Sequence, residues 1–76
     1  MKEIVETIVK ALVDNPSKVF VTEVCGASIS ILELKVDKAD LGKVIGKQGR
    51  NAGALRIILN AVSVKENRRM VLEILE

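Results

Sequence analysis

The spacing of apolar residues changes from helical to alternating and back along this chain, and that order limits the possible folds more than any single motif. Residues 2–13 carry apolar side chains at helical spacing. The stripe consists of Ile4, Ile8 and Leu12, widened by Val5 and Val9. Asp14-Asn15-Pro16 ends the segment, because the residue before a proline avoids the helical region. The sequence therefore predicts an amphipathic first helix.

Two strand-like segments follow, with only three residues between them. Val19–Cys25 is rich in β-branched residues, and Ile29–Val36 alternates between apolar and polar positions. One face of the second segment carries Leu32, Leu34 and Val36. Because Gly26-Ala27-Ser28 is so short a connection, the two strands are predicted to form an antiparallel hairpin.

The second half of the chain returns to helical spacing. A short helix is predicted over Leu41–Ile45, with Asp37 or Asp40 as its cap and Gly46 at its end. A longer helix begins near Arg50. Its predicted buried stripe is Leu55, Ile58, Leu59 and Val62.

Lys65-Glu66-Asn67 is predicted as a polar loop, and Arg69–Leu75 as the last strand. A crossover through two helices brings two strands together in parallel. The chain of 76 residues is therefore predicted to be a single α+β domain spanning residues 1–76. Its element order is α-β-β-α-α-β, with a three-stranded mixed sheet and three helices packed on one face.

The charges are unevenly distributed. The whole chain has a net charge of only +2, but the stretch from Leu41 to Lys65 has five cations and no acidic residue. That stretch is +5 and the remainder is −3. The cations are Lys43, Lys47, Arg50, Arg56 and Lys65. Such segregation is typical of a surface that faces a polyanion, although a solvated basic helix face would have the same composition.

The composition argues against several functions. The chain has no histidine, and Cys25 is its only cysteine. The commonest general base near neutral pH is therefore missing, and the lone cysteine has no histidine to activate it. No cluster has metal-ligand spacing either, so we expect no enzyme, cofactor, metal or small-molecule substrate. The lone cysteine, the lack of a signal-peptide pattern and the lack of an apolar run of ~20 residues favour a cytoplasmic protein without a membrane segment.

The segment Gly46-Lys47-Gln48-Gly49 lies between the two predicted helices. Two glycines at this spacing allow a tight turn and close approach of a ligand to the backbone. Amide groups at the start of the next helix, with Lys47 and Arg50, favour a bound phosphate. By itself the pattern also fits a simple turn. The spacing matches neither a Walker A loop nor a dinucleotide fingerprint.

Val44-Ile45-Gly46-Lys47-Gln48-Gly49-Arg50, followed by an apolar helix, resembles the KH signature. The element order is similar to the prokaryotic, type II arrangement of that fold. Three flanking segments resemble the small bacterial KhpA family of stand-alone KH proteins: residues 12–16, Leu41-Gly42-Lys43 and residues 71–76. Ala52 stands where many KH domains have a larger aliphatic residue, and it resembles the KhpA family in this. Gly53 costs about 0.5–1 kcal/mol relative to alanine, and packing or a neutral role explains it most simply.

The resemblance implies binding of single-stranded RNA. In KH domains the glycine loop clamps the backbone of about four unpaired nucleotides while their bases lie in an apolar groove. The expected groove residues are Val44, Ile45, Ala52 and Leu55, with a floor from the strand Ile29–Leu34. The expected phosphate-binding cations are Lys43, Lys47, Arg50 and Arg56.

The resemblance also implies a non-enzymatic RNA chaperone or post-transcriptional regulator. Its expected partners are RNA, a second copy in a homodimer, and a larger Jag-type KH protein in a heterodimer. Apolar residues that would face away from the main stripes are candidates for an interface: Ile29, Ile31, Val71 and Leu75. The alternative is a protein-interaction adaptor that acts mainly through dimerisation.

Overall fold

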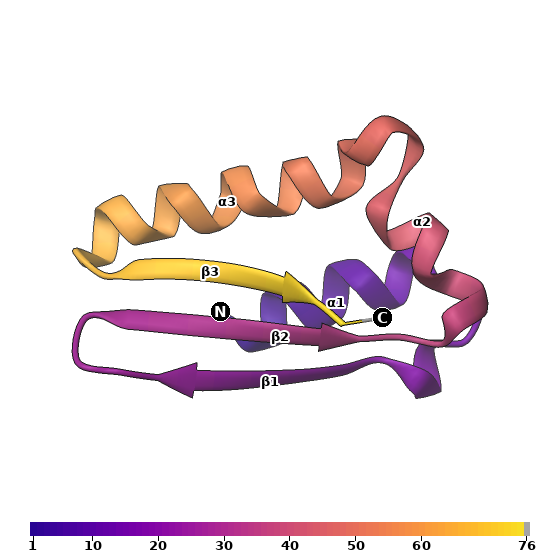
Figure 1. The fold of residues 1–76 in the computed structure, drawn as a ribbon, viewed down its shortest axis with the longest axis horizontal. Helices are drawn as coiled ribbons and strands as arrows, with labels where there is room; N and C mark the ends of the chain where they lie inside the picture. Colours follow the sequence, from indigo (N-terminus) through magenta and orange to yellow (C-terminus); the bar gives the residue numbers. More distant parts are fainter. Residues whose placement is uncertain (76) are drawn as a thin grey trace.

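The computed structural model describes residues 1–75 (Figure 1). Its main elements are α1 (Lys2–Leu12), β1 (Phe20–Cys25), β2 (Ile29–Lys35), α2 (Leu41–Ile45), α3 (Arg50–Glu66) and β3 (Arg69–Ile74). Three short 3₁₀ turns that the sequence did not predict are η1 (Pro16–Lys18), η2 (Lys38–Asp40) and η3 (Lys47–Gly49). The predicted α+β order α-β-β-α-α-β is confirmed.

The sheet has three strands in the order β1-β2-β3. β1 and β2 are antiparallel, with Phe20 opposite Lys35 and Cys25 opposite Ser30. β2 and β3 are parallel, and Ile29 lies beside Arg69. The predicted hairpin and the predicted parallel crossover are therefore both correct, and β3 is an edge strand.

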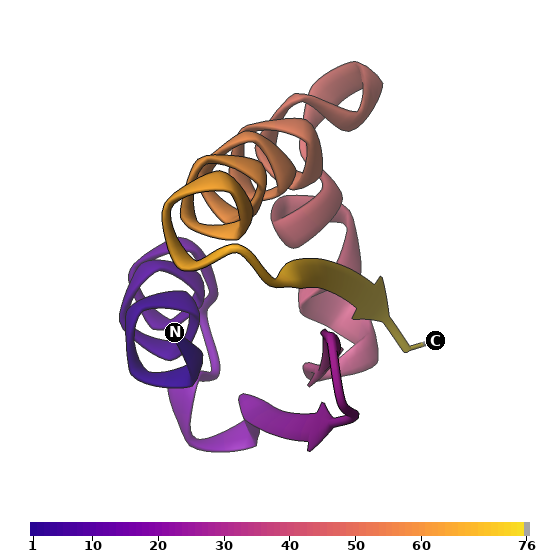
Figure 2. The same cartoon turned by 90° about the vertical axis from the view of Figure 1, so that its left-hand side faces the viewer.

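The helices lie on one side of the sheet, as Figure 2 shows from the end of the molecule. The core fills the space between them, and every second residue of β2 and β3 points into it. Its buried members include Val21, Leu32, Leu34, Met70 and Leu72 from the strands. From the helices come Val5, Val9, Val44, Leu55 and Leu59.

The predicted apolar stripe of α1 is correct in part. Ile8 is partly buried against the core. Val5 and Val9 are 1% and 0% exposed, whereas Ile4 is 51% and Leu12 is 36% exposed. Two apolar rows adjoin on this helix, and periodicity alone does not decide which row meets the sheet. The row with Val5 and Val9 continues into buried Val13 just past the helix, and this continuity places it against the core.

The long helix differs from its prediction in two ways. Ile58 is 40% exposed, so it does not belong to the buried stripe. The helix also continues through Glu66, where a loop was predicted. Asn67 ends the helix in the left-handed conformation (φ 51°), and the N–H of Arg68 donates to the carbonyl of Ser63. This is a Schellman motif, and asparagine tolerates its positive φ better than most residues.

Two polar side chains hold distant segments of the described chain together. Buried Asp40 accepts hydrogen bonds from the backbone N–H groups of Asp14 and Asn15, at 3.2 and 3.0 Å, and so joins the end of α1 to the start of α2. The Arg68 guanidinium donates to the carbonyls of Gly26, Ala27 and Ile29 and to the Ser30 hydroxyl. It therefore fixes the β1–β2 turn to the segment between α3 and β3.

Candidate nucleic-acid interface

The Gly46–Gly49 loop has an unusual backbone. Gly46, Gln48 and Gly49 have φ values of 78°, 58° and 74°. A Cβ on Gly46 would lie 2.7 Å from Cγ of Asn51, so this position excludes any side chain. Asn51 occupies that space because its amide donates to the carbonyl of Lys43 at 2.8 Å, which ties the start of α3 to α2.

This backbone leaves amide donors available at the loop. The N–H of Gly49 donates to the carbonyl of Gly46 at 3.1 Å and closes the turn. Within residues 1–75, the N–H groups of Lys47 and Gln48 have no backbone or side-chain acceptor. Because α3 begins directly after the turn, the positive end of its dipole lies at the same place. The loop is thus built to hold an anion such as a phosphate.

The predicted cations differ in whether they already form an ion pair with an acidic residue. Lys47, Arg50 and Arg56 are exposed, and none of them forms an ion pair with any residue from 1 to 75. Lys43 forms a close ion pair with Asp14, and this hydrogen bond raises the pKa of the Lys43 ammonium. Nothing in the sequence pattern indicated that contact. Asp14 therefore offsets the charge that Lys43 would present to a phosphate.

The predicted apolar groove residues mostly lie below the surface. Val44, Ala52 and Leu55 are 0%, 4% and 3% exposed, and Val44 and Leu55 are part of the core cluster. Ile45 is the exception, since it is partly exposed beside the loop. The structure therefore leaves Lys47, Arg50 and Arg56 exposed but buries three of the four predicted apolar residues.

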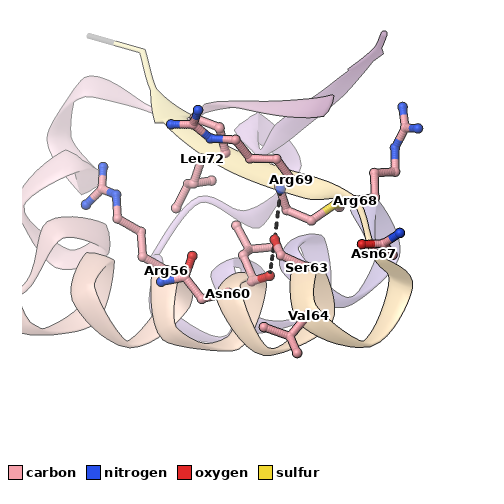
Figure 3. Close-up of a pocket in the computed structure, with 11 residues that line it drawn as sticks. Arg56, Asn60, Ser63, Val64, Asn67, Arg68, Arg69 and Leu72 are labelled. Carbon is pink, nitrogen blue, oxygen red and sulfur yellow. Dashed lines mark hydrogen bonds between the residues drawn. The ribbon is translucent and has the colours of Figure 1, made fainter. Parts of the chain in front are cut away.

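A groove of about 660 Å³ runs between α3 and β3 (Figure 3). Arg56, Asn60 and Ser63 line it from the helix, and Leu72 lines it from the strand. This groove has no lining residue from β2, the strand from which a floor was predicted, and β3 lines it instead. Asn60, Asn67 and Arg69 of this groove were not predicted from the sequence. A polar row at helical spacing from Arg56 to Asn67 could have indicated the two asparagines, whereas Arg69 on β3 had no such signal.

The free edge of β3 also faces the groove. The N–H of Arg69 donates to the Ser28 carbonyl just before β2, and that of Leu75 donates to Leu34 of β2. The backbone groups of the alternate residues of β3 therefore point the other way. The N–H of Met70 donates to the Ser63 hydroxyl on α3 at 2.8 Å. Leu72, the next residue with this orientation, presents its N–H and carbonyl to the groove. Donors and acceptors are thus available to a ligand lying between α3 and β3.

Two negative findings limit the chemistry of the described part. Residues 1–75 contain no group of three or more His, Cys, Asp or Glu side chains placed to hold a metal ion. They also contain no helix that is long and apolar enough to cross a membrane.

Two helices joined by a basic, glycine-bounded loop, set against a mixed three-stranded sheet, define a KH domain. Residues 2–74 match the family model described as "KhpA/KhpB, KH domain". The chain belongs to this family.

Its relatives extend over the whole chain. The RNA-binding protein KhpA of Clostridium acetobutylicum is 57% identical over 75 residues, which cover 99% of this chain and 100% of the relative. The RNA-binding protein KhpA of Aquifex aeolicus is 59% identical over 76 residues, covering 100% of this chain and 96% of the relative. The RNA-binding protein KhpA of Chlamydia trachomatis is 47% identical over 76 residues, covering 100% and 97%. No solved structure matches this chain.

Proposed function

We propose that this protein binds single-stranded RNA by clamping its backbone at the Gly46–Gly49 loop. One observation carries the proposal: the free N–H groups of Lys47 and Gln48 adjoin the unpaired cations Lys47 and Arg50 at the start of α3, the helix that lines the groove. The relatives are named RNA-binding proteins, which supports the same ligand.

In this proposal the loop supplies affinity, and the groove contacts the bases. Lys47, Arg50 and Arg56 attract the phosphates of about four unpaired nucleotides. Ile45 contacts a base at the surface. The buried side chains of Val44, Ala52 and Leu55 support the groove from below, and Lys43 contributes less while it is paired with Asp14.

The narrow α3–β3 groove favours unpaired bases over a duplex. A-form RNA is recognised across its wide minor groove, whereas single strands can turn their bases into a cleft. The free backbone groups at Leu72 support base contacts there. The order α-β-β-α-α-β supports the type II arrangement of the KH fold.

A single small domain with few contacts binds weakly, and this suits an RNA chaperone or post-transcriptional regulator that releases its RNA readily. We propose a cytoplasmic location, because cellular transcripts are found there and the free thiol of Cys25 is compatible with a reducing compartment.

We also propose self-association, or pairing with a larger Jag-type KH protein, which strengthens weak RNA binding by linking two sites. An exposed apolar row on α3 supports it, with Ile57 70% and Val64 84% exposed. Ala54 and Ala61 complete this row at alternating three- and four-residue spacing, which is typical of helix pairing. The open face of the sheet, with Ile29, Ile31 and Val71, is the second candidate surface.

The test of RNA binding is a double variant, Lys47→Asp/Gln48→Asp. Both side chains are exposed, and aspartate tolerates the positive φ at residue 48, so the fold is retained. Fluorescence anisotropy with single-stranded RNA at several salt concentrations should show at least about tenfold weaker binding and a shallower salt dependence. Unchanged affinity would refute the clamp.

The alternative function, a protein-interaction adaptor, is favoured by the exposed apolar row on α3. Two results together would distinguish the adaptor from an RNA-binding protein. A protein partner would co-purify equally with the wild type and with the Lys47→Asp/Gln48→Asp variant, and neither form would bind RNA.

A further inference from the structure

We propose that the distal half of the α3–β3 groove holds a further nucleotide of the same RNA, beyond those clamped at the loop. Asn60 and Asn67 contact its base. This inference rests on the RNA-binding function proposed above and extends the footprint of the protein past about four nucleotides.

The position of these residues separates them from the loop. With a rise of about 1.5 Å per helical residue, Asn60 lies about 15 Å along α3 from Arg50, and Asn67 lies about 25 Å away. Asn60 and Asn67 line the groove where α3 approaches the start of β3. A nucleotide bound there is therefore a different one from those whose phosphates contact Lys47 or Arg50.

The chemistry of the distal groove fits a nucleotide. Three arginines, two asparagines and a serine are among its eleven lining residues, and no lining residue is acidic. Asparagine amides present a donor and an acceptor side by side, which matches the edge of a base. Arginine binds phosphate in a bidentate manner. The volume of about 660 Å³ lies within the usual range for ligand sites.

Some polar side chains of the groove already form hydrogen bonds within the protein, and others are available to a ligand. Ser63 is committed, because its hydroxyl donates to the Leu59 carbonyl and accepts from the Met70 N–H. Arg68 is committed to the β1–β2 turn.

Four other side chains have no partner among residues 1–75. Within this part of the chain, no hydrogen bond or ion pair engages the side chains of Arg56, Asn60, Asn67 and Arg69. These available groups all line one groove, as Figure 3 shows for the labelled residues. A merely solvated helix face would explain Asn60, but Asn67, which follows the helix, lines the same groove with its amide also available.

The Schellman motif makes this arrangement rigid. The left-handed conformation of Asn67 is held by hydrogen bonds from its own N–H and from that of Arg68. The side chain of Arg68 holds the same segment against the hairpin. Asn67 and Arg69, on either side of Arg68, therefore have their backbones fixed before a ligand arrives, which lowers the entropy cost of binding.

The test measures dissociation constants for single-stranded RNA of four and eight randomised nucleotides. A longer RNA offers more registers to any site, but this statistical gain is equal for all variants. The ratio of the two constants in a variant, compared with the wild type, therefore isolates the distal contacts. The variants are Asn60→Glu, which repels a phosphate, and Asn67→Gly, which removes the amide while tolerating the positive φ. Thr7→Glu on exposed α1 is the charge-matched control.

The length-dependent gain is the factor by which affinity for the eight-nucleotide RNA exceeds affinity for the four-nucleotide RNA. We expect Asn60→Glu to reduce this gain by at least about fivefold, and Asn67→Gly by at least about threefold. Both variants should bind the four-nucleotide RNA within about twofold of the wild type, as Thr7→Glu does with both lengths. If both keep the full gain while Lys47→Asp/Gln48→Asp abolishes binding, the distal subsite is refuted and the clamp stands. If Lys47→Asp/Gln48→Asp binds as the wild type does, the clamp itself is refuted.

Discussion

The side chain of Asn51 occupies the space that a Cβ on Gly46 would need, with only 2.7 Å between that Cβ and the Cγ of Asn51. Gly46→Ala must therefore displace Asn51 and break its hydrogen bond to Lys43, in addition to straining φ at 78°. We expect the free energy of unfolding to fall by about 2–4 kcal/mol, measured by urea denaturation.

Gly49→Ala is the matched control for that prediction. A Cβ at Gly49 meets nothing within 4 Å, so only the strain at φ 74° remains. A loss of about 1 kcal/mol is expected. Equal losses for the two variants would contradict the role of Asn51.

The ion pair between Lys43 and Asp14 predicts a variant that binds RNA more tightly. Asp14→Asn removes the counter-charge and leaves Lys43 available to a phosphate. Affinity should rise about two- to threefold, and the slope of log K against log salt should steepen by about 0.7. The same substitution in a Lys43→Gln background should bring no such gain. A gain in both backgrounds would assign the effect to net charge alone.

Gly53 offers a position for an added cation. It lies four residues after Gly49 and three before Arg56, on the same helical face, and a Cβ there meets nothing within 4 Å. Gly53→Ala should raise the free energy of unfolding by about 0.5–1 kcal/mol. Gly53→Lys should do the same and also strengthen RNA binding about threefold in anisotropy titrations. Thr7→Lys, on the exposed side of α1, adds the same charge away from the loop and should change binding less.

Removing the buried carboxylate of Asp40 should lower the stability of the fold without weakening RNA binding. Asp40→Ala leaves the N–H groups of Asp14 and Asn15 without their acceptors, and we expect unfolding to become easier by about 2–3 kcal/mol. RNA affinity per folded molecule should remain within about twofold. Asp37→Ala, which removes an exposed cap on Ala39, should cost only about 1 kcal/mol. A larger cost at Asp37 would overturn this ranking.

The exposed row on α3 predicts a change in oligomeric state. Ile57→Glu places a charge in the middle of that row and should convert any dimer to monomer in analytical ultracentrifugation. Ile31→Glu tests the open sheet face in the same way. If only Ile31→Glu dissociates the dimer, the interface lies on the sheet.

The sequence predicts the architecture where local signals are strong. Gly46 marks the end of α2, and Arg50 begins α3, as the structure confirms. The short hairpin connection and the two-helix crossover determine how the strands pair. These features depend on neighbouring residues, so a pattern along the chain is enough to find them.

Features that depend on distant residues were not predictable. The pairing of Lys43 with Asp14 joins residues 29 apart, and Arg68 reaches the hairpin turn about 40 residues away. The choice between two apolar rows on α1 likewise depends on the sheet it meets. At the candidate site, the loop and its cations were found from the motif, but the α3–β3 groove required the strand order.

The parallel pairing of β2 with β3 has a consequence for protein synthesis. The strand that lines the groove is made after α3, and Arg68 reaches the hairpin turn only after the hairpin and α3 have both been made. A nascent chain can present the glycine loop and α3 while it still lacks the opposite wall of the groove. The full binding surface therefore forms only once β3 has been made and has paired with β2.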